Sequence, residues 1–418
     1  MKIKLLFSLI ILSFLKLSAQ QTPVIISNAT IHVGNGEVIE KGTLVMLNGK
    51  IDFVGKELKA LYKTATTIDA KGKHVYPGLV CMNTYVGLNE IDAARATRDY
   101  SEVGSVNPNV RSMIAYNTDS KIIPTIRSNG ILLTQVVPQG GLVSGSSSCM
   151  KTFGWNWEDA VYKADEGIHI NWPELVVQSR FDEKDENQKQ RIEKELQNIE
   201  EFFSQAEHYS KSTTIETFNA RFDAMKNLFN GTKKLYIHVD FAKGIMHAVN
   251  FFKKYPSIKI VLVGAQDAYQ LIELLKEKNI SVVLINIHRL PQRNSEDVDQ
   301  PFKTPAQLIN AGILTAIGHD GSWQTRNLMF NAGTAATYGL SKEDALKCIT
   351  VNAAKIMGIE STYGTLEVGK NAALLICDGD LLDMKSSNIK HAFFSGEELD
   401  LNNHQQELYK KFMNKYGF

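Results

Sequence analysis

Three apolar runs that look like buried strands end in residues able to do acid–base or metal chemistry. His238 follows the run 235–237, His288 follows 282–287, and His319 with Asp320 follows 314–318. Imidazoles together with a carboxylate bind divalent transition metals, and an open coordination position activates water. A single histidine at a strand end is more often only a hydrogen-bonded structural residue. The pattern therefore predicts a metal site only if the three strand ends meet in one pocket.

The middle of the chain alternates such apolar strands with helical patterns. Strands are expected at 75–82, 131–137, 235–239, 258–263, 281–287 and 313–317, and helices at 268–278 and 305–311. This alternation favours an α/β protein whose parallel sheet is covered on both faces. The span 74–360 is close to the roughly 250 residues of a (β/α)₈ barrel, in which strand ends converge on one site. Spacing alone leaves an open doubly wound sheet as the alternative, although no G-x-G-x-x-G motif follows the early strands.

Both ends of the chain carry short β-prone runs. They lie at 23–27, 31–33, 42–47 and 50–54, and again at 364–367, 373–377 and 392–395. Asn48-Gly49 is typical of a tight hairpin turn, because both turn positions need positive φ. The two ends, 22–72 and 363–398, are therefore predicted to share one β-domain, with 399–418 as a C-terminal tail.

A helical insertion is predicted at about 186–230, within the barrel span. Apolar residues recur there at helical spacing in two stretches, with charged residues between them. We favour two helices that pack on the barrel and leave a solvated outer face. A hairpin that binds a partner is the alternative.

Composition and the N-terminus restrict the class and location of the protein. The 418 residues include 46 Lys and Arg against 45 Asp and Glu, a balance that argues against a nucleic-acid binder. Lys2 and Lys4, the apolar run 5–15 and the small residues before Gln20 predict a signal peptide at 1–19 and an exported, periplasmic or secreted chain. An N-terminal membrane anchor is the alternative, and no later segment predicts a membrane span. The four cysteines show no C-x-x-C spacing, which favours buried free thiols.

Three motifs carry a family resemblance. They are KGKHVYPGLV at 71–80, ITVNAAKIMG at 349–358 and GTLEVGKNAAL at 364–374. In this order they resemble the amidohydrolase superfamily, in particular its imidazolonepropionase-like branch. The resemblance implies a (β/α)₈ TIM-like barrel with a composite β-sandwich from both chain ends. It also implies metal-dependent hydrolysis of C–N bonds other than peptide bonds, in a cyclic amide, an N-acyl amino acid or a dipeptide-like substrate.

The sequence departs from the family pattern at the metal ligands. The family's His-x-His pair is replaced by Asn83 and Tyr85, and its strand-six histidine falls at Val263-Gly264. No Lys or Glu could be assigned to strand four. His238 matches the strand-five histidine, and Asp320 matches the strand-eight aspartate that acts as catalytic base. We therefore expect a reduced site with one zinc or other divalent ion at His238 and Asp320, assisted by His288 or His319, or no ion at all.

A loop rich in glycine and serine is predicted at 138–148. Its backbone N–H groups could line the pocket mouth, so Gly141 and Ser144, with Tyr85, are candidates for substrate binding. A plain connection is the alternative for this loop. The function predicted is hydrolysis of a small amide-type molecule by a reduced metal site. The alternatives are a barrel that only binds a small ligand, and a subunit that pairs with a complete relative. For partners, the sequence leaves open a homo-oligomer or pairing with a related amidohydrolase.

Overall fold

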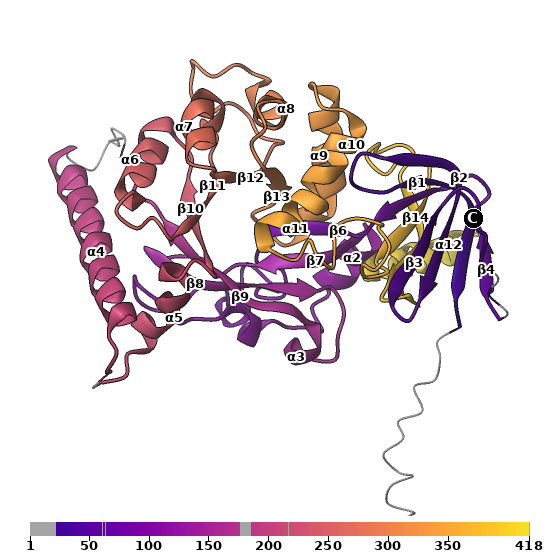
Figure 1. Cartoon of the computed structure of the whole chain (residues 1–418), viewed down its shortest axis with the longest axis horizontal. Helices are drawn as coiled ribbons and strands as arrows, with labels where there is room; N and C mark the ends of the chain where they lie inside the picture. Colours follow the sequence, from indigo (N-terminus) through magenta and orange to yellow (C-terminus); the bar gives the residue numbers. More distant parts are fainter. Residues whose placement is uncertain (1–21, 61, 63, 176–184, 216, 418) are drawn as a thin grey trace, which may run out of the picture.

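The structure is a computed structural model that describes residues 22–60, 62, 64–175, 185–215 and 217–417. It contains a closed eight-stranded barrel and a second, mixed sheet beside it (Figure 1). The predicted signal peptide lies outside the described residues. Within them, no helix is long and apolar enough to cross a membrane.

The barrel strands follow one another along the chain. They are β6 (Leu79–Thr84), β7 (Ile131–Val136), β8 (Val143–Lys151), β9 (Val161–Asn171), β10 (Lys234–Val239), β11 (Lys259–Gly264), β12 (Ser281–Ile285) and β13 (Thr315–Gly318). Closure is made by β13 beside β6, where Gly318 pairs with Met82. The sequence-based expectation of an α/β protein with a TIM-like barrel is confirmed.

One barrel strand runs against the others. β8 is antiparallel to both β7 and β9, whereas the remaining neighbours are parallel. The prediction of a loop at 138–148 was therefore wrong from Val143 onward, where strand β8 begins. The serines from Ser144 to Ser148 are buried, because their hydroxyl groups find hydrogen-bond partners inside the protein. Small side chains there fit a crowded barrel wall, although they lack the apolar signal of a strand.

Helices cover the outside of the barrel between its parallel strands. Their bounds are α2 (Ile122–Ser128), α6 (Ala242–Phe252), α7 (Ile272–Glu277), α8 (Gln300–Asn310), α9 (Leu328–Thr337), α10 (Lys342–Cys348) and α11 (Val351–Met357), with short α3 (Trp157–Ala160) between β8 and β9. Single 3₁₀ turns are η1 (Arg95–Thr97), η2 (Ser112–Ala115), η3 (Ala268–Gln270) and η4 (Trp323–Asn327). The buried face of α6 carries Ile245, Ala248, Val249 and Phe252, at the i, i+3, i+4, i+7 spacing of an amphipathic helix.

The insertion forms α4 (Asp185–Lys211) and α5 (Ala220–Phe229). Phe203 and Ala206 of α4 and Met225 of α5 are buried in the same core as Phe252 of α6. Asn219 caps α5 by accepting from the main-chain N–H groups of Arg221 and Phe222. In the described residues α4 and α5 thus share an apolar core with the barrel helix α6 (Figure 1).

The second sheet contains strands from both chain ends. Its members are β1 (Val24–His32), β2 (Val38–Leu47), β3 (Lys50–Gly55), β4 (Thr66–Asp69), β5 (His74–Pro77), β14 (Leu374–Asp378), β15 (Asn388–Phe394) and β16 (Glu397–Glu398), followed by α12 (His404–Tyr416). β5 pairs with β1 on one side and β14 on the other, so early and late strands lie side by side (Figure 1). These strands form one sheet, and a separate composite β-sandwich with the predicted bounds stays a prediction.

Gly78 separates this sheet from the barrel. The expected strand 75–82 is divided there into β5 and β6. A Cβ at Gly78 would overlap the Tyr363 hydroxyl and the Leu132 side chain, so only glycine allows this close approach. The chain thereby leaves one sheet and enters the other within a single residue.

The four cysteines are buried free thiols, as expected. Burial raises the pKa of Cys348 to about 12, so this thiol stays protonated and inert.

Candidate functional site at the carboxyl end of the barrel

The predicted site residues lie at the carboxyl ends of parallel barrel strands. His238 lies on β10, the fifth barrel strand, Gly264 ends β11, the sixth, and His319 and Asp320 follow β13, the eighth. The main-chain N–H of His319 donates to Met82 at the end of β6. Because parallel strands present their carboxyl ends at one mouth of the barrel, these residues share that mouth.

A cavity of about 360 Å³ opens beside His238 at the ends of β9, β10 and β11. Its wall combines aromatic, carboxylate and amide side chains, among them Trp172, Glu174, Asp240, Phe241 and Gln292. A larger cavity of about 600 Å³ is lined by Lys234, Lys259 and Ser281, the first residues of β10, β11 and β12. That cavity lies at the amino ends of the strands, away from the predicted residues, so the smaller one is the candidate site.

His238 is held by a second histidine. Its Nε2 lies 2.9 Å from Nδ1 of His169 on β9, and the His169 ring stacks on Tyr236 with centroids 4.5 Å apart. Burial lowers the pKa of His238 to about 4. Burial, and then His238, lower the pKa of His169 well below its ordinary value. Both rings are therefore neutral at pH 7.

Asp240 occupies the space left by the missing strand-six side chain. A Cβ on Gly264 would overlap Oδ1 of Asp240, and Gly264 has φ +84°, which disfavours other residues. Asp240 follows His238 by two residues and lines the same cavity. Burial raises the pKa of Asp240; Arg289 and a hydrogen bond from Gln266 oppose this effect, and the charges of Asp320 and Glu174 add to it. The site thus has a carboxyl group whose pKa lies above its ordinary value.

Asp320 and Tyr85 stand near each other at the mouth. The Asp320 side chain is 45% exposed. Burial raises the pKa of Tyr85, and the charges of Asp92 and Asp320 raise it further. Tyr85 packs on Tyr100 with ring centroids 5.2 Å apart. These interactions place Asp320 within electrostatic reach of both Tyr85 and Asp240.

The other predicted ligands are directed elsewhere. His288 Nε2 lies 2.7 Å from the Thr334 hydroxyl of α9. His319 Nδ1 is 4.0 Å from Asp320 Oδ1 and has no hydrogen-bond partner, although it is buried. Burial is the main cause that lowers the pKa of His288 and of His319. Within the described residues, no hydrogen bond joins either one to His238.

The donors at this mouth do not fit a divalent ion. In the described part of the chain, no three His, Cys, Asp or Glu side chains lie close enough to hold a metal. His238 already uses Nε2 on His169, and Asn83 presents a buried Oδ1 without a partner where the family has imidazole. A neutral amide oxygen is a weak ligand for zinc. The predicted single-metal site therefore has no support in this arrangement.

Gly141 and Ser144 contact the cavity wall through hydrogen bonds to Asn171. The Asn171 side-chain amide donates to the Gly141 carbonyl at 2.7 Å and to the Ser144 hydroxyl at 3.1 Å. Asn171 itself lines the cavity, whereas Gly141 and Ser144 do not. Their predicted role in substrate binding stays a prediction, and the contacts assign them a part in orienting Asn171.

Sequence reasoning missed a buried carboxylate in the fourth barrel strand. Glu166 of β9 is 5% exposed and accepts hydrogen bonds from Gln135, Ser147 and Tyr236. His169 and Asp240 were missed as well. The run Ile168-His169-Ile170, with its alternation of apolar and polar residues, was the available signal of a strand with a histidine on one face.

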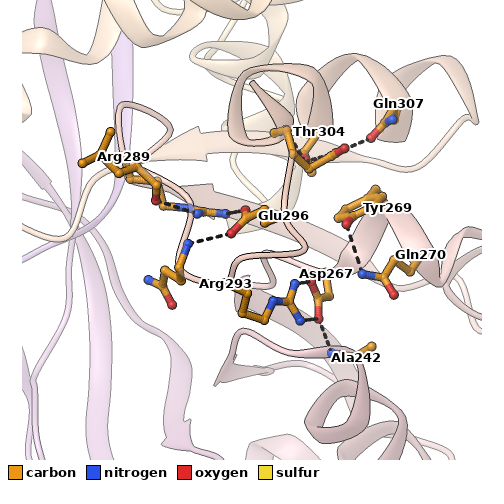
Figure 2. A network of polar contacts seen from close by, with 12 residues as sticks. Ala242, Asp267, Tyr269, Gln270, Arg289, Arg293, Glu296, Thr304 and Gln307 are labelled. Atoms are coloured by element: carbon orange, nitrogen blue, oxygen red, sulfur yellow. Dashed lines mark hydrogen bonds and ion pairs between the residues drawn. The ribbon is translucent and has the colours of Figure 1, made fainter. Parts of the chain in front are cut away.

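A tethered loop borders the cavity between β12 and α8. Arg293 donates twice to the buried carboxylate of Asp267, which also accepts from the main-chain N–H of Ala242 (Figure 2). Arg289 Nη2 lies 2.5 Å from Glu296 Oε1 within the loop. These ion pairs hold Gln292 of the same loop at the cavity wall.

The chain is similar to characterised proteins along most of its length. The model of the amidohydrolase family matches residues 157–399, more than half of the chain. An imidazolonepropionase of Caldanaerobacter subterraneus subsp. tengcongensis is 24% identical over 379 residues, covering 83% of this chain and 86% of the relative. A 5-methylthioadenosine/S-adenosylhomocysteine deaminase of Moorella thermoacetica is 23% identical over 394 residues, covering 85% of each.

Solved structures show the same fold. An amidohydrolase from Thermotoga maritima MSB8 aligns with TM-score 0.77 and 22% identity over 90% of this chain and 99% of the other. A Xaa-Pro dipeptidase aligns with TM-score 0.56 and 14% identity over 91% of this chain and 100% of the other. The chain belongs to the amidohydrolase family. This confirms the resemblance seen in the sequence and the expected class, a hydrolase that acts on C–N bonds.

Proposed function

We propose that this protein hydrolyses the C–N bond of a small amide-type molecule bound in the cavity beside His238. The proposal rests on one observation: the half-buried carboxyl of Asp240 fills the space above Gly264 within the electrostatic reach of Asp320. Two carboxyl groups with different environments can divide the roles of base and acid between them. No step of this proposal passes through a metal ion, because the donors do not fit one.

The roles follow from burial. Asp320, which is partly exposed, is the base: it takes a proton from water while the water oxygen attacks the carbonyl carbon. Asp240, whose pKa is raised, is the acid: its proton goes to the leaving nitrogen as the C–N bond breaks. The products are a carboxylic acid and an amine. Proton transfer from Asp320 to Asp240 through water then restores the starting state.

The size of the cavity restricts the substrate. A volume of about 360 Å³ accommodates a molecule of a few amino-acid equivalents at most. Cyclic amides, N-acyl amino acids and dipeptide-like amides satisfy this limit. The likeness to imidazolonepropionases and to a Xaa-Pro dipeptidase supports the same classes.

The test is hydrolysis of a panel of these three classes by the purified protein, in the presence of EDTA and, separately, of added zinc. We expect turnover in EDTA, lost in both Asp240→Asn and Asp320→Asn. Asp223→Asn on the outer helix α5 is the matched control and should retain full activity. Turnover that appears only with zinc, or that survives both substitutions, would contradict the proposed chemistry.

A second candidate function is ligand binding without turnover. The replacement of two family ligands by Asn83 and Tyr85 favours it. A panel compound that raises the melting temperature of the wild type, without being hydrolysed, would support this alternative. Association with a related amidohydrolase or with a second copy remains a further proposal, tested by light scattering of the protein alone and of the two proteins mixed.

A further inference from the structure

A continuous chain of hydrogen bonds crosses the barrel interior and ends at His238. It runs from the main-chain N–H of Asn83 through the side chains of Gln135, Glu166, Ser147 and His169. These four side chains are at most 5% exposed. Because water is excluded along the chain, each group must be satisfied by its neighbours.

The direction of the hydrogen bonds is set at the Asn83 end. A main-chain N–H can only donate, so the Gln135 atom 3.1 Å from it is the carbonyl oxygen, Oε1. The amide nitrogen of Gln135 therefore faces Glu166, 2.5 Å from Oε1. The first two bonds of the chain thus both point towards Glu166.

Glu166 accepts on both of its oxygens. In addition to Gln135, the Ser147 hydroxyl lies 2.6 Å from Oε1 and the Tyr236 hydroxyl 2.8 Å from Oε2. Three donors thus surround this one carboxyl group, and the Ser147 hydroxyl is one of them. The Ser147 hydroxyl therefore donates its only proton to Glu166.

The two histidines must then donate in sequence. The Ser147 oxygen lies 2.8 Å from Nε2 of His169. Because its only proton is donated to Glu166, this oxygen accepts a hydrogen bond from His169. His169 carries its proton on Nε2, which leaves Nδ1 as the acceptor for the Nε2 proton of His238, 2.9 Å away. In this arrangement each ring uses one nitrogen as a donor and, in His169, the other as an acceptor, which is the pattern of an imidazole with a single N–H.

We propose that Glu166, Ser147 and His169 are positioning residues that hold His238 as the Nε2–H tautomer, with the Nδ1 lone pair available to the cavity. Nδ1 has no hydrogen-bond partner among the described residues, and His238 lines the cavity. In the proposed hydrolysis, on which this role rests, Nδ1 accepts a hydrogen bond from the attacking water or from a substrate N–H group. If the Ser147 hydroxyl instead donated to His169, lone pairs of the Ser147 oxygen and of Glu166 Oε1 would face each other at 2.6 Å.

The tautomer can be read directly by NMR in the full chain. Two-bond ¹H–¹⁵N correlations of ¹⁵N-histidine-labelled protein in EDTA distinguish a protonated from a bare ring nitrogen, and His238→Gln assigns the signal. We expect His238 to be protonated on Nε2 only. In Ser147→Ala the His169 Nε2–H loses its acceptor, so the single tautomer is lost and both forms of His238 appear.

Ser146→Ala is the matched control, because its hydroxyl donates to Pro108 rather than into this chain. It should retain the wild-type tautomer. Protonation of His238 on Nδ1 in the wild type would overturn the proposal, as would an unchanged single tautomer in Ser147→Ala. If Ser147→Ala folds poorly, the wild-type spectrum still tests the proposal, because it shows directly which nitrogen of His238 is protonated. A confirmed tautomer in a protein without turnover would contradict the proposed hydrolysis and leave this inference intact.

Discussion

Acidification is expected to destabilise this protein through His238. The folded-state pKa of this ring is lowered by burial from 6.5 to about 4. Between these two pH values the unfolded chain binds a proton that the folded chain does not, so stability falls as pH falls. Above the ordinary value of 6.5 both states are neutral, and the contribution to stability is fully present.

The magnitude follows from the two pKa values. Each tenfold difference in proton affinity is worth about 1.4 kcal/mol, so the interval from 6.5 to about 4 corresponds to about 3 kcal/mol of unfolding free energy lost between pH 7 and pH 4. His169, with its own lowered pKa, adds to the loss in the same direction. For a protein of ordinary stability this is a large fraction of the total.

Urea unfolding at a series of pH values from 4 to 8, in EDTA, measures this effect. His238→Gln removes the titrating ring, so its stability should fall less on acidification than that of the wild type, by about 2–3 kcal/mol. His404→Gln on the exposed helix α12 is the control and should follow the wild type. Equal pH dependence in the wild type and His238→Gln would refute the lowered pKa assigned to this imidazole.

Four further predictions concern the same mouth and the chain terminus. Gly264→Ala places a Cβ against Asp240 in a positive-φ conformation and is expected to cost about 1–2 kcal/mol in urea unfolding, together with any hydrolytic activity; wild-type values for both would contradict the contact. Calorimetric titration with zinc is expected to show no stoichiometric binding. A tight one-to-one isotherm would contradict the conclusion that the side chains at this mouth do not fit a divalent ion. Arg293→Ala removes both bonds to Asp267, so the loop should become more sensitive to limited proteolysis; unchanged cleavage would show that these bonds do not restrain it. N-terminal sequencing of exported protein should begin near Gln20, and recovery of Met1 would reject the predicted signal peptide.

Several elements of the barrel were predictable from the sequence because their strands are continuously apolar. The runs 131–137 and 235–239 coincide closely with β7 and β10, since strands buried on both faces need no polar alternation. β8 escaped prediction because its serines and glycine lack that signal. Their hydroxyl groups are acceptable in the interior only when tertiary partners such as Glu166 and Asn171 are present.

The positions of His238 and Asp320 at strand ends were also fixed by the sequence, through the family motifs and the apolar runs before them. The loss of ligands at Asn83, Tyr85 and Gly264 was visible there too. What the sequence could not determine is which groups replace them. Asp240 enters the empty space above Gly264 only because the turn after β10 folds its carboxyl back over β11.

The hydrogen-bond chain to His238 depended most on tertiary structure. Gln135, Ser147, Glu166 and His169 come from three strands, and no spacing in the sequence relates them. They meet because β7, β8 and β9 are neighbours in the barrel, with β8 reversed. Sequence patterns report the periodicity of one segment at a time, whereas the satisfaction of a buried polar group depends on side chains that only the closed barrel brings within hydrogen-bond distance.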